Sequence, residues 1–176
     1  MNHFLAAQLV GLLAVFLSLA VYQFNNRKTM LLLSMLGAMS WSIHFYMLGA
    51  NTGAATNLIA VGWSYVFLKV KPSRYNIWIP IVFLIGDIIA AYYTWQGYVS
   101  LFAVSGSMIY VIAFWFRSTK IIRRLSLISP FMWFVYNILS GSYPGMFFEI
   151  FTFTSNLIGQ YRFDLKSNKS LSKTLI

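Results

Sequence analysis

The sequence predicts an all-α membrane protein, with seven transmembrane helices in a 3+1+3 arrangement of two parallel triple-helix-bundle repeats. Three observations predict it. Hydrophobic residues make up 59% of the 176-residue chain and charged residues only 9%, whereas a soluble domain carries about 25% charged residues. Apolar segments alternate with short connections that are charged, then neutral. The second half of the chain also matches the first half at a fixed offset of 92 positions.

Seven apolar segments account for most of the chain. A helix needs about 20 apolar residues to cross about 30 Å of hydrocarbon. The segments expected to cross are residues 4–24, 29–49, 52–68, 76–95, 98–116, 121–140 and 144–162. We expect the first to be a retained span, because neither a basic leader nor a small-residue cleavage site accompanies it.

Charge divides the connections into two sets. All thirteen Lys and Arg residues fall in or beside the first, third and fifth connections or after the seventh segment. By the positive-inside rule that side is cytoplasmic, which places the N-terminus in the periplasm and the C-terminus in the cytoplasm. The basic clusters are therefore interpreted as topology signals and not as a nucleic-acid site. Residues 1–163 are expected to form one transmembrane domain and residues 164–176 a flexible cytoplasmic tail.

The self-match predicts an internal repeat. Without any gap, Trp41 aligns with Trp133 and Gly49 with Gly141, and such a fixed offset is the signature of a repeat. Repeat one covers about 4–68, the linker helix about 76–95 and repeat two about 98–162. Three spans reverse the direction of the chain across the membrane and the linker span restores it, so both copies run the same way.

Polar residues recur at equivalent positions of the two copies. His44 aligns with Tyr136, and Asn57 aligns with Glu149. Lipid cannot satisfy such groups, so they are expected to face protein or water. A rise of 1.5 Å per residue places them about 7–9 Å below the outer hydrocarbon boundary. The expected substrate-binding residues are Trp41, His44, Asn57, Trp133, Tyr136, Asn137 and Glu149.

Two carboxylates and one proline are further candidates. A charged carboxylate in hydrocarbon costs several kcal/mol, so Glu149 and Asp87, which lies near the middle of the fourth segment, are the expected ion-coupling residues. Pro130 lies inside the sixth segment, where it is expected to kink the helix and is the candidate hinge. A purely structural role stays open for each of these residues: interhelical hydrogen bonds for the polar groups and a static bend for the proline.

Several functional classes lack the residues they need. The chain has no cysteine and only two histidines, and these do not stand at metal-ligand spacing. No Gly-x-Ser-x-Gly nucleophile motif occurs. A retinal photoreceptor needs a lysine in its seventh helix, whereas Lys166 lies beyond that segment. We therefore expect neither an enzyme nor a bound cofactor or metal.

Short motifs add a family resemblance. From Leu9 to Phe163 the chain resembles the bacterial inner-membrane proteins of the YgjV family. More distantly it is similar to the SWEET sugar facilitators and the PQ-loop transporters, although no proline precedes Gln23 and Glu149 stands where that pattern has a second asparagine. The motifs that carry the resemblance are Tyr22-Gln23 ahead of Arg27-Lys28, Trp41-Ser-Ile-His44 with Leu48-Gly49-Ala50, Asn57-Leu, and Trp133-Phe-Val-Tyr136.

Two functions follow from these expectations. The first is a transporter or facilitator of a small polar solute across the bacterial inner membrane, with the SWEET-like alternating access that the resemblance implies. The alternative is a non-transporting membrane protein that binds lipid or a partner protein and uses the polar residues of its helices only for helix packing. The lipid bilayer is the expected surrounding in both cases, and the sequence leaves open whether the chain forms a homodimer.

Overall fold

The computed structural model describes residues 3–165, and this part of the chain folds into helices without any strand. The predicted all-α class is therefore confirmed. The eight α-helices of this part are α1 (His3–Ser18), α2 (Arg27–Met47), α3 (Asn51–Lys69), α4 (Trp78–Tyr93), α5 (Val99–Trp115), α6 (Thr119–Leu125), α7 (Ser129–Leu139) and α8 (Tyr143–Gln160). Three short helical turns adjoin them, namely η1 (Val21–Gln23), η2 (Arg74–Asn76) and η3 (Tyr161–Leu165).

Local chemistry sets several helix ends. The Asn26 side chain accepts hydrogen bonds from the backbone amides of Lys28 and Thr29 and so caps the start of α2. Gly49 after α2 and Gly141 after α7 have φ angles of +72° and +67°. This left-handed conformation ends helices, and side chains other than that of glycine disfavour it. The two glycines align in the predicted repeat, so equivalent helices end in the same way.

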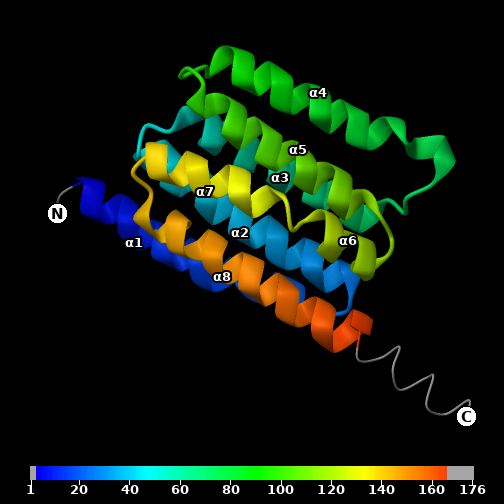
Figure 1. Cartoon of the computed structure of the whole chain (residues 1–176). Helices are drawn as coiled ribbons and strands as arrows, with labels where there is room; N and C mark the ends of the chain where they lie inside the picture. Colours follow the sequence, from blue (N-terminus) through cyan, green and yellow to red (C-terminus); the bar gives the residue numbers. More distant parts are fainter. Residues whose placement is uncertain (1–2, 166–176) are drawn as a thin grey trace, which may run out of the picture.

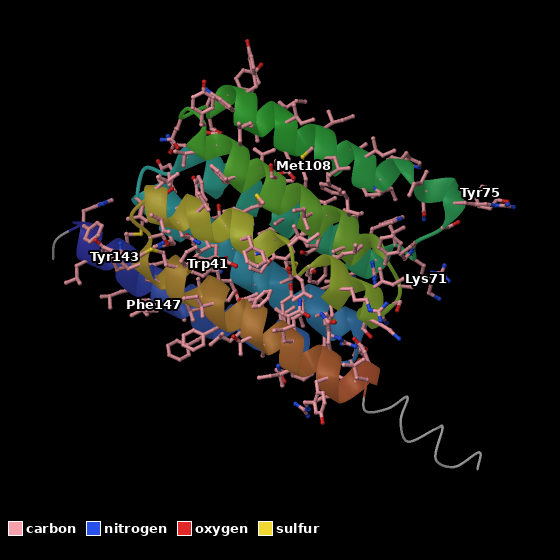
Figure 2. The ribbon with its side chains drawn as sticks, viewed as in Figure 1. Trp41, Lys71, Tyr75, Met108, Tyr143 and Phe147 are labelled. Carbon is pink, nitrogen blue, oxygen red and sulfur yellow. The ribbon has the colours of Figure 1, made fainter. Side chains whose placement is uncertain are left out.

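The connections between helices lie alternately at two ends of the molecule (Figure 1). At the basic end lie the connections α1–α2, α3–α4 and α5–α6 and the end of α8. At the neutral end lie the connections α2–α3, α4–α5 and α7–α8. The Lys and Arg residues of the described chain lie in or beside the connections of the basic end, where Figure 2 marks Lys71.

Several helices suit a membrane. Within residues 3–165, three helical stretches are long and apolar enough to cross one: His3–Gln23, Arg27–Met47 and Arg74–Tyr93. Val99–Trp115 is a shorter apolar helix. Large apolar side chains cover the outside, among them Phe16, which is 76% exposed, and Phe147, which is 62% exposed. Apolar surface of this kind marks contact with lipid or protein, so the protein meets the bilayer through several helices.

Six helices form a closed ring around the interior. Going round it, α1 packs on α2, α2 on α3, α3 on α5, α5 on α7, α7 on α8, and α8 returns to α1. The fourth helix lies outside this ring, against α3 and α5 (Figure 1). Two apolar clusters fill the inside. One includes Met30, Trp63 and Phe114, and the other includes Phe45 and Trp133.

The predicted sixth segment, residues 121–140, is not one continuous helix. It divides into α6 and α7. Pro130 stands in the first turn of α7, where a missing backbone N–H leaves no hydrogen bond unmade. The Ser129 hydroxyl beside it donates to the Gly106 carbonyl at 2.8 Å, which ties the start of α7 to α5. The candidate hinge therefore lies at a helix start and not within a kinked helix.

The end of the described chain is held in place. The expected tail starts at residue 164, but η3 continues to Leu165. Asp164 is 6% exposed and pairs with Arg123. The rest of the expected tail, residues 166–176, lies outside the described residues.

Candidate functional site

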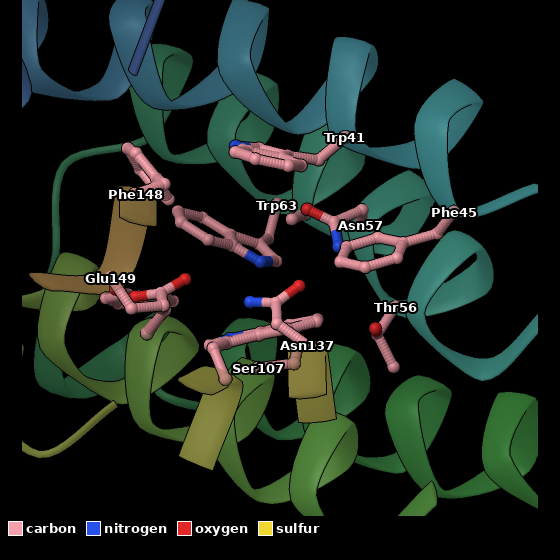
Figure 3. Close-up of a pocket in the computed structure, with 12 residues that line it drawn as sticks. Trp41, Phe45, Thr56, Asn57, Trp63, Ser107, Asn137, Phe148 and Glu149 are labelled. Atoms are coloured by element: carbon pink, nitrogen blue, oxygen red, sulfur yellow. The ribbon is translucent and has the colours of Figure 1, made fainter. Parts of the chain in front are cut away.

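A cavity of about 60 Å³ lies inside the helix ring (Figure 3). Six of its lining residues come from α2 and α3, and six come from α5, α7 and α8. The two copies of the predicted repeat therefore contribute equally. The lining residues are Trp41, Phe45, Thr56, Asn57, Ala60, Trp63, Ser107, Tyr110, Trp133, Asn137, Phe148 and Glu149. Small-molecule sites enclose about 300–1,000 Å³, so the cavity in this conformation is smaller than a typical ligand site.

A second space of about 80 Å³ adjoins the cavity on the side of the basic end. Tyr22 of η1 and Phe114 near the end of α5 line this second space. The residues that line both spaces are Trp41, Asn57, Ala60, Trp63, Tyr110 and Phe148. The two spaces therefore lie next to each other, and the residues between them are mostly aromatic, with one amide among them.

Five of the seven predicted substrate-binding residues line the cavity. They are Trp41, Asn57, Trp133, Asn137 and Glu149. These side chains come from four helices, and the prediction grouped them from the repeat offset together with their depth along the helices.

Polar atoms without partners gather on the cavity wall. Both polar atoms of Asn137, Oε2 of Glu149 and the indole nitrogens of Trp41 and Trp63 are buried and have no hydrogen-bond partner in the described chain. Figure 3 shows the Asn137 amide, the Glu149 carboxylate and the Trp63 indole nitrogen turned toward the same space. Indole and amide N–H groups donate, while the amide and carboxylate oxygens accept. Most buried polar groups in proteins are paired, so this cluster marks a place for a polar partner.

Aromatic rings form much of the cavity wall. Phe45 stacks on Trp133 with ring centroids 5.7 Å apart and on Trp41 with centroids 5.9 Å apart. Trp41 also contacts Phe148 across α2 and α8, at 5.1 Å. The cavity therefore combines flat apolar faces with unpaired donors and acceptors, which is the usual make-up of a site that orients a small molecule.

His44 and Tyr136 make contacts near the neutral end and do not line the cavity. His44 Nε2 lies 2.7 Å from Ser142 Oγ, and its other ring nitrogen lies 2.7 Å from a backbone carbonyl of α1. The Tyr136 hydroxyl accepts from the Gly53 amide at 2.7 Å and lies 3.2 Å from the Ala50 carbonyl oxygen, to which it donates. Because Ser142 and Ala50 align in the repeat, each copy reaches the same position of the other. We call these two contacts the neutral-end clasp.

The direction of these side chains has a simple cause. Residues three apart on an α-helix point about 60° apart. Trp41 faces the cavity, so His44 is turned aside toward α1 and the α7–α8 connection. The same relation holds for Trp133 and Tyr136.

Arg27 joins the two halves at the basic end. Its guanidinium donates to the Phe67 carbonyl at the end of α3 at 2.9 Å. It also donates to the carbonyls of Phe114 and Phe116 at the end of α5, at 2.9 and 2.8 Å. Carbonyls at a helix end lack helical partners and favour a positive charge. Arg27 therefore does more than set topology, and we call this contact the basic-end latch.

A second arginine at this end is fully buried. Arg123 on α6 donates to both carboxylate oxygens of Asp164, at 2.5 and 3.0 Å, and to Asn25 Oδ1 at 3.2 Å. The Asn156 amide of α8 donates to the Arg123 carbonyl at 2.8 Å. These contacts hold α6, α8 and η3 together with the connection that follows η1.

Two predicted residues stand apart from the cavity centre. Asp87 on α4 is fully buried but does not line the cavity. It belongs to a helix that packs on α3 and α5 from outside the ring. Pro130 is buried and lines a groove of about 290 Å³ that Glu149 also borders.

Sequence reasoning missed several lining residues. Trp63 is 1% exposed and supplies an unpaired indole N–H. It stands three residues after Ala60 and six after Asn57, so the helical spacing of that polar face could have indicated it. Phe45 follows the predicted His44, and Phe148 precedes the predicted Glu149. Nothing in the sequence distinguishes these two phenylalanines from the many that face lipid.

Fold and site together define a class: an all-α membrane protein with several apolar helices and an internal cavity that is both polar and aromatic. The chain belongs to the bacterial inner membrane protein family Imp-YgjV, which it matches over residues 5–167. The predicted family and membrane are thereby confirmed. Comparisons with curated proteins and with solved structures gave no match. The more distant resemblance to SWEET and PQ-loop transporters stays a prediction.

Proposed function

We propose that the protein is a transporter or facilitator that moves a small polar solute across the inner membrane. The observation that carries the proposal is the set of unpaired polar atoms of Trp63, Asn137 and Glu149 around the cavity. An unpaired buried polar group costs about 1–3 kcal/mol. A bound solute, or water that exchanges with it, supplies the missing partners.

Polar groups that serve helix packing behave differently in this protein. His44, Tyr136 and Asn156 are each at most 1% exposed, and each bonds to another helix or connection. Asn137 is equally buried but has no partner. This contrast favours a solute site over the packing alternative, because packing alone selects paired groups.

The cavity is closed at both ends by contacts between the halves. The neutral-end clasp joins α2 and α3 to α7 and α8, and the basic-end latch joins α3 to α5 through Arg27. Each closure consists of a few hydrogen bonds, worth about 1 kcal/mol each. Opening one end while the other stays closed is alternating access between two halves that move against each other.

The proposal includes the predicted 3+1+3 topology. We count α6 and α7 together as one of seven passes and α4 as the linker. In the predicted repeat α1 corresponds to α5, and α3 corresponds to α8. The α1–α8 contact therefore corresponds to the α5–α3 contact, and both contacts occur in the ring. The positive-inside rule assigns the basic end to the cytoplasm, with the N-terminus in the periplasm and the C-terminus in the cytoplasm.

The second candidate, lipid binding without transport, has one observation in its favour. The groove beside Glu149 is lined by Pro130, Phe131, Phe134, Ile150 and Phe153 and lies on the outer surface of α7 and α8. An acyl chain fits such an apolar groove. In that case lipid would remain bound after purification, while no solute would cross.

Osmotic swelling of proteoliposomes tests the proposal. Small polar solutes, including polyols, amino acids and amines, are added outside, and their entry is followed by light scattering. We expect the protein to admit at least one solute class, and Glu149→Gln to reduce its entry at least tenfold while the protein stays folded. The matched control is Ile150→Val, the next residue on α8, which is 53% exposed on the lipid side. Normal entry in Glu149→Gln, or no entry of any solute in the folded protein, contradicts the proposal.

A further inference from the structure

We infer that the solute is an organic cation, a small molecule with an ammonium group that pairs with Glu149. This inference rests on the proposed function, because it names the chemical class of the molecule that occupies the cavity. Three features carry it: a buried carboxylate without a counter-charge, aromatic faces around it, and neutral polar groups beyond it.

The charge balance of the interior is the first feature. Glu149 is 6% exposed, and its Oε2 atom has no partner. No Lys, Arg or His lines either of the two adjoining spaces. In the described chain the buried arginine Arg123 already pairs with Asp164, and Arg27 donates to backbone carbonyls. The described residues therefore offer Glu149 no cation, and a charged carboxylate in this setting is stabilised by a ligand that brings one.

The aromatic lining is the second feature. Six of the twelve lining residues are aromatic, and three of them are tryptophans. A cation within about 6 Å of an aromatic ring face is attracted to it, most strongly by tryptophan. Figure 3 places Glu149 on the same side of the space as Phe148, below Trp63. A carboxylate beside aromatic faces is the arrangement that recognises an ammonium group, whether primary or fully methylated.

The remaining polar groups fit the rest of such a molecule. Asn137 offers a donor and an acceptor, and the Trp63 indole offers a further donor. These groups can bond a hydroxyl or carbonyl group a few atoms away from the charge. An anionic solute is disfavoured, because it would lie next to Glu149 with no arginine or lysine on the wall to neutralise it.

Binding to the purified full-length protein in detergent tests the inference. The probes are two matched pairs: choline with its neutral carbon isostere, in which a tert-butyl group replaces the trimethylammonium group, and ethanolamine with ethylene glycol. Tryptophan fluorescence reports binding, because three tryptophans line the cavity. We expect at least one ammonium compound to bind about tenfold or more tightly than its neutral partner. Glu149→Gln should abolish this preference, and Glu149→Asp should keep it.

The control is Ile150→Val, a change at the next residue on α8, which is 53% exposed and does not line the cavity. It should leave the preference unchanged. Equal binding within both pairs, no binding of any ammonium compound, or a preference that survives in Glu149→Gln would overturn the inference. The swelling assay tests transport independently of this inference. Entry of uncharged polyols without any preference for cations would refute the organic-cation inference but leave the transport proposal standing. No entry of any solute would refute the transport proposal itself.

Discussion

Replacing Asn137 by leucine separates a solute site from a packing contact. Asn137 is 1% exposed, and neither its Nδ2 nor its Oδ1 has a partner. Burying such atoms costs about 1–3 kcal/mol each, whereas an apolar side chain of similar size costs nothing of this kind. We therefore expect Asn137→Leu to increase the free energy of unfolding by about 1–3 kcal/mol and to abolish solute entry. Gain of stability with loss of function is the mark of a strained functional site.

The matched control is Asn156→Leu. Asn156 is also fully buried, but its amide donates to the Arg123 carbonyl at 2.8 Å. Removing it leaves a buried carbonyl without that partner, so we expect a loss of about 1–3 kcal/mol. Both free energies are measured by SDS titration of the protein in mixed micelles, with solute entry followed in proteoliposomes. If Asn137→Leu destabilises the protein as much as the control does, Asn137 is a packing residue and the reasoning about the cavity fails.

Two further predictions concern the two ends of the cavity. Tyr136→Phe removes both hydrogen bonds that the Tyr136 hydroxyl makes in the neutral-end clasp. The native chain has no cysteine, so a cysteine introduced as Asn57→Cys reports access to the cavity, and its labelling by a membrane-impermeant thiol reagent should speed up about fivefold or more. An unchanged rate would show that the clasp does not gate the cavity. Arg123→Met should cost about 3–5 kcal/mol, because it leaves Asp164 buried and unpaired. Adding Asp164→Leu should recover much of that loss in the same SDS titration, and strictly additive losses would contradict the ion pair.

The repeat offset was the most informative part of the sequence. It predicted that Gly49 and Gly141 end equivalent helices, and both adopt positive φ angles. It also brought Trp41, Trp133 and Glu149 into one group, and all three line the cavity. An offset works across the chain because it compares positions without reference to the path of the backbone between them.

Other features depended on information that a single sequence does not hold. Pro130 indicated a disturbance in the sixth segment, but the break into α6 and α7 depends on contacts such as that of Ser129 with α5. His44 was placed on the cavity because polar residues were assumed to share a face. The basic cluster at Arg27 predicted topology alone, since the reach of an arginine side chain says nothing about which carbonyls it meets.

The two-fold pattern of the ring fails at one informative position. Asn57 and Glu149 align in the repeat, and both line the cavity, yet only one of them is acidic. A fully symmetric cavity would bind a solute equally well in either of two opposite orientations. An acid on one half alone removes that equivalence, so a solute with a charged ammonium group and a neutral remainder, as proposed above, would bind in one orientation, with its charged end toward α8.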